Sequence, residues 1–300
     1  MSIRTCALIA RYADTRIADS SAQLAAHLRA RGVAVLVPDD DSVPAAPGDV
    51  RAVDEAELVR QAELVIAIGG DGTLLYAAGL VATRGTPLLG VNRGRLGFLT
   101  DVSPDDMLAS VDAAIEGRCV VDYRPLLAAE IMAATAQSPG LPAQRGLALN
   151  DVVLEGAQPG RLLDFSTTID GRFVNAHGGD GLVIATATGS TAYALSCGGP
   201  IVEPGLDALV VAPICPHTLS DRPIVVSGRS VIEVALVERP DCHGQVSCDG
   251  RPLGELMPGD KLVVRPSPNK ITLLHPSGYD YFRLLRSKLN WGRRNFDPAR

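Results

Sequence analysis

Short apolar runs alternate with amphipathic segments over the first hundred residues. The apolar runs are 5–10, 33–38, 64–68 and 87–91. Each is too short for a helix and is followed by polar residues or glycine, which predicts four buried strands. The segments between them with helical spacing of apolar residues are 20–32, 53–61 and 73–85. Strands that alternate with helices are typical of a parallel sheet covered on both faces.

The pattern changes after a further helical segment at 103–118. From Cys119 onward, β-branched runs are separated by Gly, Pro and Asn, with one short helix after the Thr-Gly-Ser at 188–190. This pattern predicts a β-rich domain. The polar segment 134–146 contains Pro and Gly and is interpreted as a hairpin loop, and 281–291 returns to helical spacing.

The predicted fold class is therefore an α/β domain with a parallel sheet, followed by a β-rich domain. We place the α/β domain at 1–102, joined by the C-terminal segment 278–300, and the β-rich domain at 103–277.

Composition narrows the class of protein. The chain has 300 residues, 46% hydrophobic and 21% charged, as in ordinary globular proteins. The net charge of −6 argues against a nucleic-acid partner, and the basic cluster 283–294 is interpreted as a solvated terminal helix. No apolar run reaches membrane length, so we expect no membrane association and a cytoplasmic location. The six cysteines include no Cys-x-x-Cys pair, which predicts reduced thiols and no zinc site.

The first candidate site is the turn Gly-Gly-Asp-Gly after the third predicted strand. Carboxyl ends of parallel strands are where open α/β sheets bind ligands. Backbone N–H groups at Gly69, Gly70 and Gly72, with the helix start near Thr73, suit a phosphate group. The turn matches neither the P-loop nor the dinucleotide fingerprint, and no lysine follows it. We therefore expect a divalent cation, Mg²⁺ or Mn²⁺, to share the neutralisation. The alternative is an ordinary turn in which Asp71 caps the helix.

Two further clusters follow in the β-rich half. Asn150 and Asp151 precede a β-branched strand, and Asp180 stands between glycines before a long apolar strand. That strand ends in a Thr-Gly-Ser-Thr turn at 188–191, which offers hydroxyls, and Tyr193 offers a ring on which a base can stack. Each cluster alone has an ordinary reading as a turn or a helix cap. Their joint presence favours a nucleotide site.

These residues resemble a known family. The stretches GGDGTLL, LND, DGLVIATATGSTAYALSCGGPI, PHTLSDRPIV and SCDG are together similar to those of bacterial NAD kinases, which phosphorylate NAD to NADP with ATP. The resemblance runs from the first strand to KLNW. It implies that NAD binds in the cleft between the two domains and that Asp71 is the proton acceptor.

The resemblance also assigns individual residues. The NAD-binding positions are Asp71, Gly72, Asn150, Asp151, Arg161, Asp180, Thr191, Ala192, Tyr193, Ala194, Leu195 and Ser196. Further candidates are Gly178, Asp249 and Arg251. The family more often has a glutamate at 151, a proline at 187 and a basic residue at 178. The roles of 178 and 251 therefore stay open.

The resemblance implies a homodimer or homotetramer in which a neighbouring subunit contacts NAD. The protein ligands of the metal are not identified by any motif. Arg124 and Arg222 suit either phosphate contact or a structural ion pair. Alternative functions are a lipid or sugar kinase on the same scaffold, a non-catalytic NAD or NADP sensor, and an NAD-dependent dehydrogenase. The missing dinucleotide fingerprint argues against the last.

Overall fold

The chain folds into two compact units in a computed structural model that describes residues 3–39, 50–93, 97–133, 144–157, 162–237 and 242–290. Unit 1 comprises Met1–Tyr123 and Ile271–Arg300, and unit 2 comprises Arg124–Lys270. These limits differ from the predicted ones at 102 and 278. The reason is that two strands, β6 (Val120–Met132) and β17 (Lys261–His275), run from one unit into the other without interruption. Composition does not change at such a crossing.

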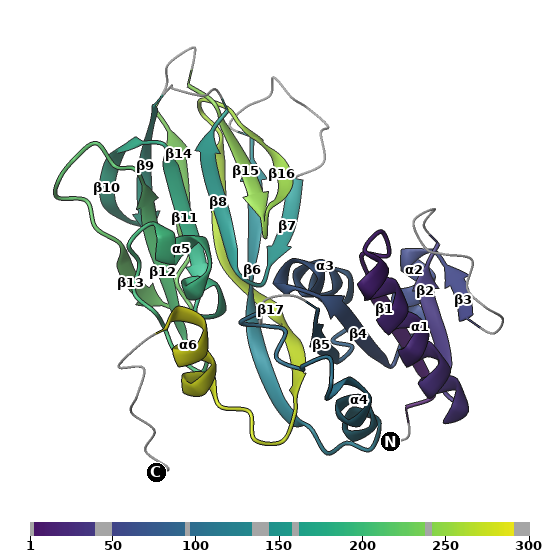
Figure 1. Ribbon diagram of the computed structural model, residues 1–300. Coiled ribbons are helices and arrows are strands. Elements are labelled where there is room, and N and C mark those ends of the chain that lie inside the picture. Colours follow the sequence, from purple (N-terminus) through teal and green to yellow (C-terminus); the bar gives the residue numbers. More distant parts are fainter. Residues whose placement is uncertain are drawn as a thin grey trace, which may run out of the picture. The chain divides into compact units, whose positions relative to one another are not determined.

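Unit 1 is built on a parallel sheet with the strand order β5-β4-β1-β2-β3 (Figure 1). Its strands are β1 (Thr5–Ala10), β2 (Ala34–Pro38), β3 (Val50–Val53), β4 (Leu64–Gly69) and β5 (Leu88–Asn92). Its helices are α1 (Thr15–Ala30), α2 (Glu55–Gln61), α3 (Asp71–Val81), α4 (Met107–Ile115) and α6 (Tyr281–Leu289). Every residue of β4 is buried, as expected for a strand covered on both faces. The four predicted strands are confirmed, and β3 is a short additional edge strand.

The strand order places a switch in winding direction between β1 and β4. From β1 the chain passes through α1 to β2 on one side, and from β4 it passes through α3 to β5 on the other. The helices α1 and α4 share one apolar core with the sheet, while α2 packs against α3. In such doubly wound sheets, ligands bind beyond the carboxyl ends of the strands at this switch.

Helix α1 begins earlier than the sequence predicts. Asp14 caps it by accepting from the Arg16 N–H at 3.0 Å, whereas the prediction used the serine pair at 20. Ser20 and Ser21 instead donate to the carbonyls of the preceding turn, at 2.7 and 2.9 Å. Serine hydroxyls can also make this bond inside helices, so a serine pair alone does not locate a helix start.

Unit 2 is β-rich. One layer contains β9 (Leu163–Ile169), β10 (Arg172–Gly179) and β14 (Ile232–Leu236) with parts of β6 and β17, and β6 pairs with β7 (Gln144–Ala148). The second layer is a six-stranded sheet in the order β13-β12-β11-β8-β15-β16. Its strands are β8 (Asp151–Gly156), β11 (Gly181–Thr186), β12 (Ala208–Ile214), β13 (Ile224–Ser227), β15 (Gly244–Cys248) and β16 (Arg251–Leu256).

The two layers of unit 2 enclose one apolar core. Phe165 and Ile232 from the first layer meet Leu182 and Val246 from the second, all at most 1% exposed. The outer face of the six-stranded sheet is covered by the helix α5 (Tyr193–Ser196), where Ala194 packs in a second buried cluster. Most of the predicted hairpin loop, residues 134–143, lies outside the described residues.

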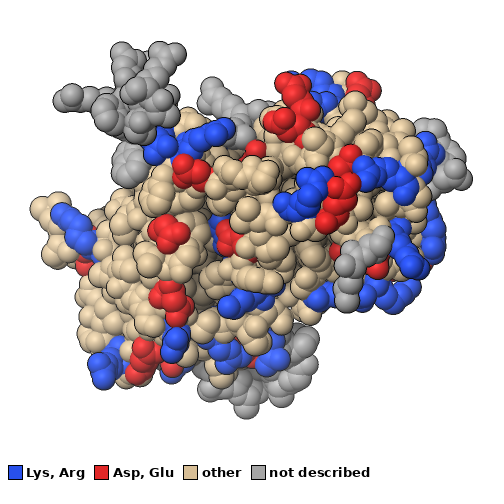
Figure 2. Space-filling model, turned by 90° about the horizontal axis from the view of Figure 1, so that it is seen from below, with Lys and Arg blue, Asp and Glu red and all other residues tan. Residues whose placement is uncertain are grey.

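Charged side chains of both signs are interspersed on the face shown in Figure 2. Within the described ranges, no helix combines the length and apolarity needed to cross a bilayer. None of the six cysteines forms a disulfide, and three of them are buried.

Candidate functional site

Asp71 is the first residue of helix α3, directly beyond the carboxyl end of β4. The N-cap position belongs to Gly70, and no side chain makes a capping bond there. Helix α3 therefore begins two residues before the predicted start at Thr73, and the alternative reading of Asp71 as a helix cap is wrong. Its carboxylate is directed to another segment of unit 1.

That segment is 98–100, which follows β5. Asp71 Oδ2 accepts from the Phe98 N–H at 2.8 Å, and Oδ1 accepts from the Leu99 and Thr100 N–H groups, each at 3.1 Å. The Thr100 hydroxyl donates to the same Oδ1 at 3.1 Å and accepts from Asn92 Nδ2 at 3.1 Å. An ionised carboxylate offers about four acceptor positions, two on each oxygen. Oδ1 is thus fully engaged, while Oδ2 keeps room for one more donor.

Gly97 makes this close approach possible. A Cβ atom at residue 97 would lie 1.8 Å from Asp71 Oδ1 and 2.3 Å from Thr100 Oγ1. Such distances are far inside van der Waals contact, so only glycine fits beside the Asp71 carboxylate. Sequence reasoning missed Gly97, Thr100 and Asn92. The available signal was a glycine-containing segment at the carboxyl end of the strand next to β4.

The glycines of the Gly-Gly-Asp-Gly turn serve two different purposes. A Cβ at Gly69 would lie 2.5 Å from the hydroxyl of Thr73, which is itself buried, so this glycine is required by internal packing. Cβ atoms at Gly70 and Gly72 would meet nothing within 4 Å. Neither residue has the positive φ that demands glycine. The fold itself thus does not require glycine at 70 and 72, and both residues are exposed.

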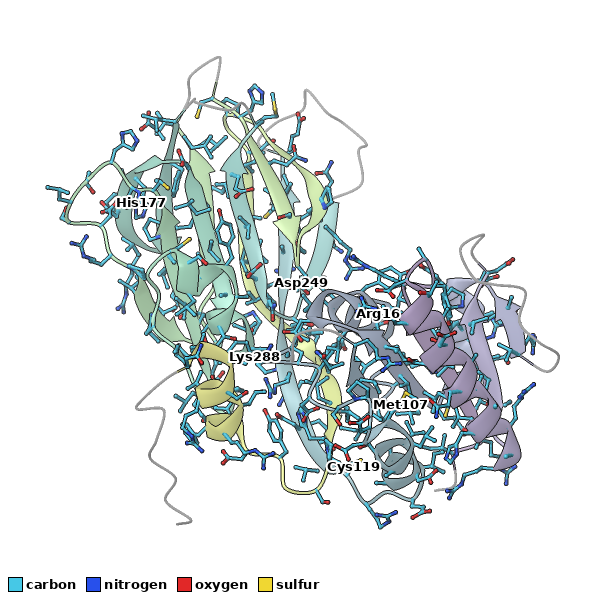
Figure 3. The ribbon with its side chains drawn as sticks, in the orientation of Figure 1. Arg16, Met107, Cys119, His177, Asp249 and Lys288 are labelled. Atoms are coloured by element: carbon cyan, nitrogen blue, oxygen red, sulfur yellow. The ribbon has the colours of Figure 1, made fainter. Side chains whose placement is uncertain are left out.

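In unit 2, Asp249 organises the start of β8. It lies in the turn between β15 and β16 (Figure 3) with a left-handed φ of 49°. Its carboxylate accepts from the N–H groups of Leu149 at 2.7 Å, Asn150 at 2.8 Å and Asp151 at 3.2 Å. Burial raises the pKa of Asp249, partly offset by these N–H groups. The contacts explain the residue as a clamp on the Asn-Asp pair.

Asp151 is a buried carboxylate, 6% exposed. Burial, and to a lesser degree the charge of Asp249, raises the pKa of Asp151 to about 7. The Tyr193 N–H bonds to the Asp151 carboxylate and opposes this rise in pKa. A buried acid with a pKa near neutrality is typical of functional sites. It is also the point where the Asn-Asp segment meets the first residue of α5.

The Thr-Gly-Ser-Thr turn, a 3₁₀ helix η1 (Thr188–Thr191), packs directly on Asn150. A Cβ at Gly189 would lie 2.1 Å from the Asn150 carbonyl oxygen, so glycine is required there. The Thr186 N–H donates to the same carbonyl at 2.9 Å. Ser190 is fully buried and its hydroxyl bonds to Ala187 and Val202 carbonyls at 2.7 and 3.2 Å. The expectation that the Ser190 hydroxyl faces a ligand is therefore wrong.

The segment 191–196 presents both buried and exposed side chains. Ala194 is fully buried, whereas Tyr193 is 37% exposed and its hydroxyl donates to Glu155 at 3.0 Å. Thr191, Ala192 and Leu195 are half-buried and Ser196 is exposed. The Tyr193 ring is thus held at its hydroxyl end while remaining open to a planar group.

The other predicted residues are placed as follows. Asp180 is exposed at the start of β11 and hydrogen-bonds the Cys215 thiol, which raises the pKa of that thiol. Gly178 lies in β10, where a Cβ would come within 3.1 Å of an oxygen of Asp164. Arg251 is exposed and its charge acts on Asp249. Arg161 lies outside the described residues.

The two arginines with open roles are both engaged within unit 2. Arg124 is 2% exposed and donates to the Thr188 hydroxyl at 3.2 Å. Arg222 donates to the carbonyls of Leu219 and Asp221 at 2.7 and 2.8 Å. In these contacts Arg124 supports the η1 turn and Arg222 shapes its own loop.

The fold and these clusters define a class. A doubly wound sheet with a carboxylate in a glycine turn beyond its strand ends is typical of proteins that bind a nucleotide or a related ligand at that edge. Two family models match this chain, the ATP-NAD kinase N-terminal domain over residues 9–119 and the ATP-NAD kinase C-terminal domain over residues 149–275. The chain therefore belongs to the ATP-NAD kinase family, which confirms the resemblance and the fold class.

Individual relatives agree with this assignment. The NAD kinase of Methylococcus capsulatus is 42% identical over 97% of this chain and 98% of its own length. The NAD kinase of Halorhodospira halophila is 44% identical over 96% of this chain and 93% of its own.

Solved structures share the fold. The yeast NADH kinase complexed with NADH matches with a TM-score of 0.89 at 24% identity, covering 99% of this chain and 90% of that one. An NAD kinase from Archaeoglobus fulgidus in complex with ATP matches with a TM-score of 0.74 at 26% identity, covering 95% and 98%.

Proposed function

We propose that this protein transfers the γ-phosphoryl group of ATP to the 2′-hydroxyl of the adenosine ribose of NAD, giving NADP and ADP. Membership of the ATP-NAD kinase family supports the reaction. The observation that carries the mechanism is the Asp71 carboxylate, oriented by four donors beside two glycines that the fold does not itself require.

Asp71 acts as the general base. The ribose oxygen forms a bond to the γ-phosphorus, its proton passes to Asp71, and the bond from the γ-phosphorus to the bridging oxygen breaks with its electrons leaving on ADP. Oδ2 is the oxygen that receives the proton, because Oδ1 already accepts three hydrogen bonds. A positioned base contributes about 10²–10⁴-fold to the rate of such a step.

NAD is held chiefly by unit 2. Asn150 and Asp151 bind the dinucleotide, the Tyr193 ring and the rest of 191–196 pack around adenine, and Asp180 and Gly72 complete the contacts. The support is that the Asn-Asp segment, the η1 turn and α5 form one hydrogen-bonded group within unit 2. Four further residues remain candidates for NAD binding on the strength of the resemblance: Arg161, Gly178, Asp249 and Arg251.

The phosphates of ATP lie on the backbone at Gly69, Gly70, Gly72 and Thr73. A divalent cation, Mg²⁺ or Mn²⁺, accompanies them. Among the residues that the structure describes, no group of three or more His, Cys, Asp or Glu side chains is arranged to hold a metal. Magnesium commonly keeps most of its ligands as water and phosphate oxygens, so we assign the cation to the phosphates of ATP.

The assembly is inferred from the resemblance, and the location from the absence of an apolar run of membrane length in the sequence. We propose a homodimer or homotetramer in the cytoplasm, in which a neighbouring subunit contacts NAD. Size-exclusion chromatography with light scattering measures the subunit number directly.

The test is turnover of purified protein with ATP, Mg²⁺ and NAD, detected by an NADP-specific dehydrogenase. Asp71→Asn should lower kcat about 10²–10⁴-fold with a much smaller change in the dissociation constant for NAD. Thr100→Val removes one of the four donors and leaves the carboxylate in place, so its loss should be smaller. A near-normal kcat in Asp71→Asn would contradict the role of Asp71. ATP consumption with diacylglycerol but not NAD, or NAD binding without any ATP consumption, would favour the lipid-kinase or the sensor alternative.

A further inference from the structure

A buried histidine in unit 1 lies between two carboxylates that the mechanism above does not use. His275 is 1% exposed, and its Nδ1 lies 2.9 Å from Asp101 Oδ2. Its Nε2 lies 3.6 Å from Asp122 Oδ2, and the Tyr279 ring stacks on the imidazole with centroids 3.8 Å apart and planes at 10°. Because an ionised carboxylate only accepts hydrogen bonds, Nδ1 is the donor to Asp101.

Asp101 is the residue that directly follows the segment holding Asp71. The N–H groups of residues 98–100 all bond to the Asp71 carboxylate. On the other side of Asp101, the Val102 N–H donates to the Gly90 carbonyl at 3.2 Å, and the Val102 carbonyl accepts from the Asn92 N–H at 2.8 Å. The segment 98–102 is thus held at one end by Asp71, at the other end by β5, and between them by the Asp101 side chain on His275.

The Asp101 side chain gives segment 98–102 a point of attachment between its two ends. The bonds at Val102 fix the peptide groups on either side of that residue. The bond from the buried His275 ring to Asp101 then fixes the residue that connects those peptide groups to the N–H groups of 98–100. Side chains whose own orientation is locked by packing and hydrogen bonds are what keep a catalytic group in place.

His275 is suited to be a rigid anchor. It is the last residue of β17, and Asp122 belongs to β6, so the imidazole lies between the two strands that continue into unit 2. Stacking on Tyr279 further restricts the ring. A buried, stacked ring has little freedom to reorient.

We propose that His275 is a positioning residue for phosphoryl transfer, which acts through Asp101 on the N–H groups that orient the Asp71 carboxylate. The inference rests on the proposed role of Asp71 as the base. It predicts an effect on the chemical step rather than on the binding of ATP or NAD.

The experiment compares His275→Leu, which removes the donor, with His275→Asn, whose amide can still donate to Asp101. We expect His275→Leu to lower kcat about 10- to 100-fold, the scale of an error of about 1 Å in positioning. The KM values for ATP and NAD should change less than about 3-fold, and His275→Asn should recover most of kcat. His27→Leu is the matched control, because the pair that His27 forms with Asp112 at 2.7 Å in the same unit includes no residue of segment 98–102.

A double-mutant cycle separates positioning from mere structural support. If His275 acts through Asp71, His275→Leu should cause no further loss of kcat in the Asp71→Asn background. Equal fold losses in both backgrounds, or wild-type kcat in His275→Leu, would overturn the proposal. Asp101→Ala removes the same contact without altering the buried ring, so it tests the same prediction if His275→Leu does not fold.

The outcomes also distinguish this proposal from the proposed function. If Asp71→Asn retains its kcat, the role of Asp71 fails and the positioning role fails with it. If Asp71→Asn loses activity while His275→Leu and Asp101→Ala do not, only the positioning role is wrong.

Discussion

Replacing Gly97 by alanine tests the geometry around Asp71 most directly. The new Cβ would begin 1.8 Å from Asp71 Oδ1, whereas Cβ atoms essentially never come within 3.0 Å of such neighbours. The carboxylate and the segment 98–100 must therefore separate by about 1 Å or more. The Phe98, Leu99 and Thr100 N–H bonds now measure 2.8, 3.1 and 3.1 Å. A shift of this size takes at least some of them beyond hydrogen-bonding range.

The size of the effect follows from those bonds. A hydrogen bond to a charged group contributes about 1.5–3 kcal/mol, so losing one or two should lower the free energy of unfolding by about 2–5 kcal/mol. An error of about 1 Å in the position of a catalytic group lowers the rate about 100-fold. We therefore expect Gly97→Ala to be both less stable and much slower, with kcat affected more than either KM.

The assay pairs urea unfolding with NADP-coupled kinetics, and Gly72→Ala is the control. A Cβ at residue 72 meets nothing within 4 Å, and alanine is favoured over glycine in a helix by about 1 kcal/mol. Gly72→Ala should thus be at least as stable as the wild type. It should raise the KM for ATP if phosphates approach that backbone. Wild-type kcat and stability in Gly97→Ala would refute the account of how Asp71 is held.

Three further predictions concern unit 2. Burial raises the pKa of Asp151 from 3.8 to about 7, so its contribution to stability is present below about pH 4 and is lost as the pH rises through 7. Asp151→Asn should therefore gain stability relative to the wild type as the pH rises from 4 to 8, on the order of 1.4 kcal/mol per unit of pKa shift. Urea unfolding of both proteins at a series of pH values measures this gain. A difference in unfolding free energy that does not change with pH would contradict the prediction. Gly189→Ala places a Cβ 2.1 Å from the Asn150 carbonyl oxygen, and backbone must move, so we expect a loss of about 2 kcal/mol or more in unfolding free energy and a raised KM for NAD. Tyr193→Phe loses only the exposed bond to Glu155 and should keep its KM for NAD, whereas Tyr193→Ala should raise it by removing stacking of about 1 kcal/mol; equal KM values in the two variants would show that the ring does not bind the base.

Two aspartates of this chain, Asp71 and Asp249, make similar hydrogen bonds in different surroundings. Asp71 and Asp249 each accept three backbone N–H bonds from a distant segment. Asp249 sits in a left-handed turn and clamps the Asn-Asp pair, while Asp71 starts a helix beside open glycines. The difference in their surroundings, rather than in their bonds, supports the chemical role proposed for Asp71, while Asp249 holds the Asn-Asp pair and remains a candidate NAD-binding residue.

The sequence by itself determined the features that depend on near neighbours. Buried parallel strands, the helices between them, the β-rich second half and the glycine turn after β4 were all visible, because side-chain period and turn chemistry act over a few residues. The family motifs added the candidate residues. Prediction from neighbouring residues failed at the serine pair inside α1, because a serine hydroxyl can either cap a helix or bond to a carbonyl within it.

Only the tertiary structure decided which segments hold the candidate residues. Gly97 and Thr100 meet Asp71 because β5 lies beside β4, Asp249 reaches Asn150 because β15 pairs with β8, and His275 reaches Asp101 because β17 ends next to β5. Strand order arises from the burial of whole faces and not from any short stretch of sequence. For that reason the groups that orient Asp71 could not be read from the residues around it.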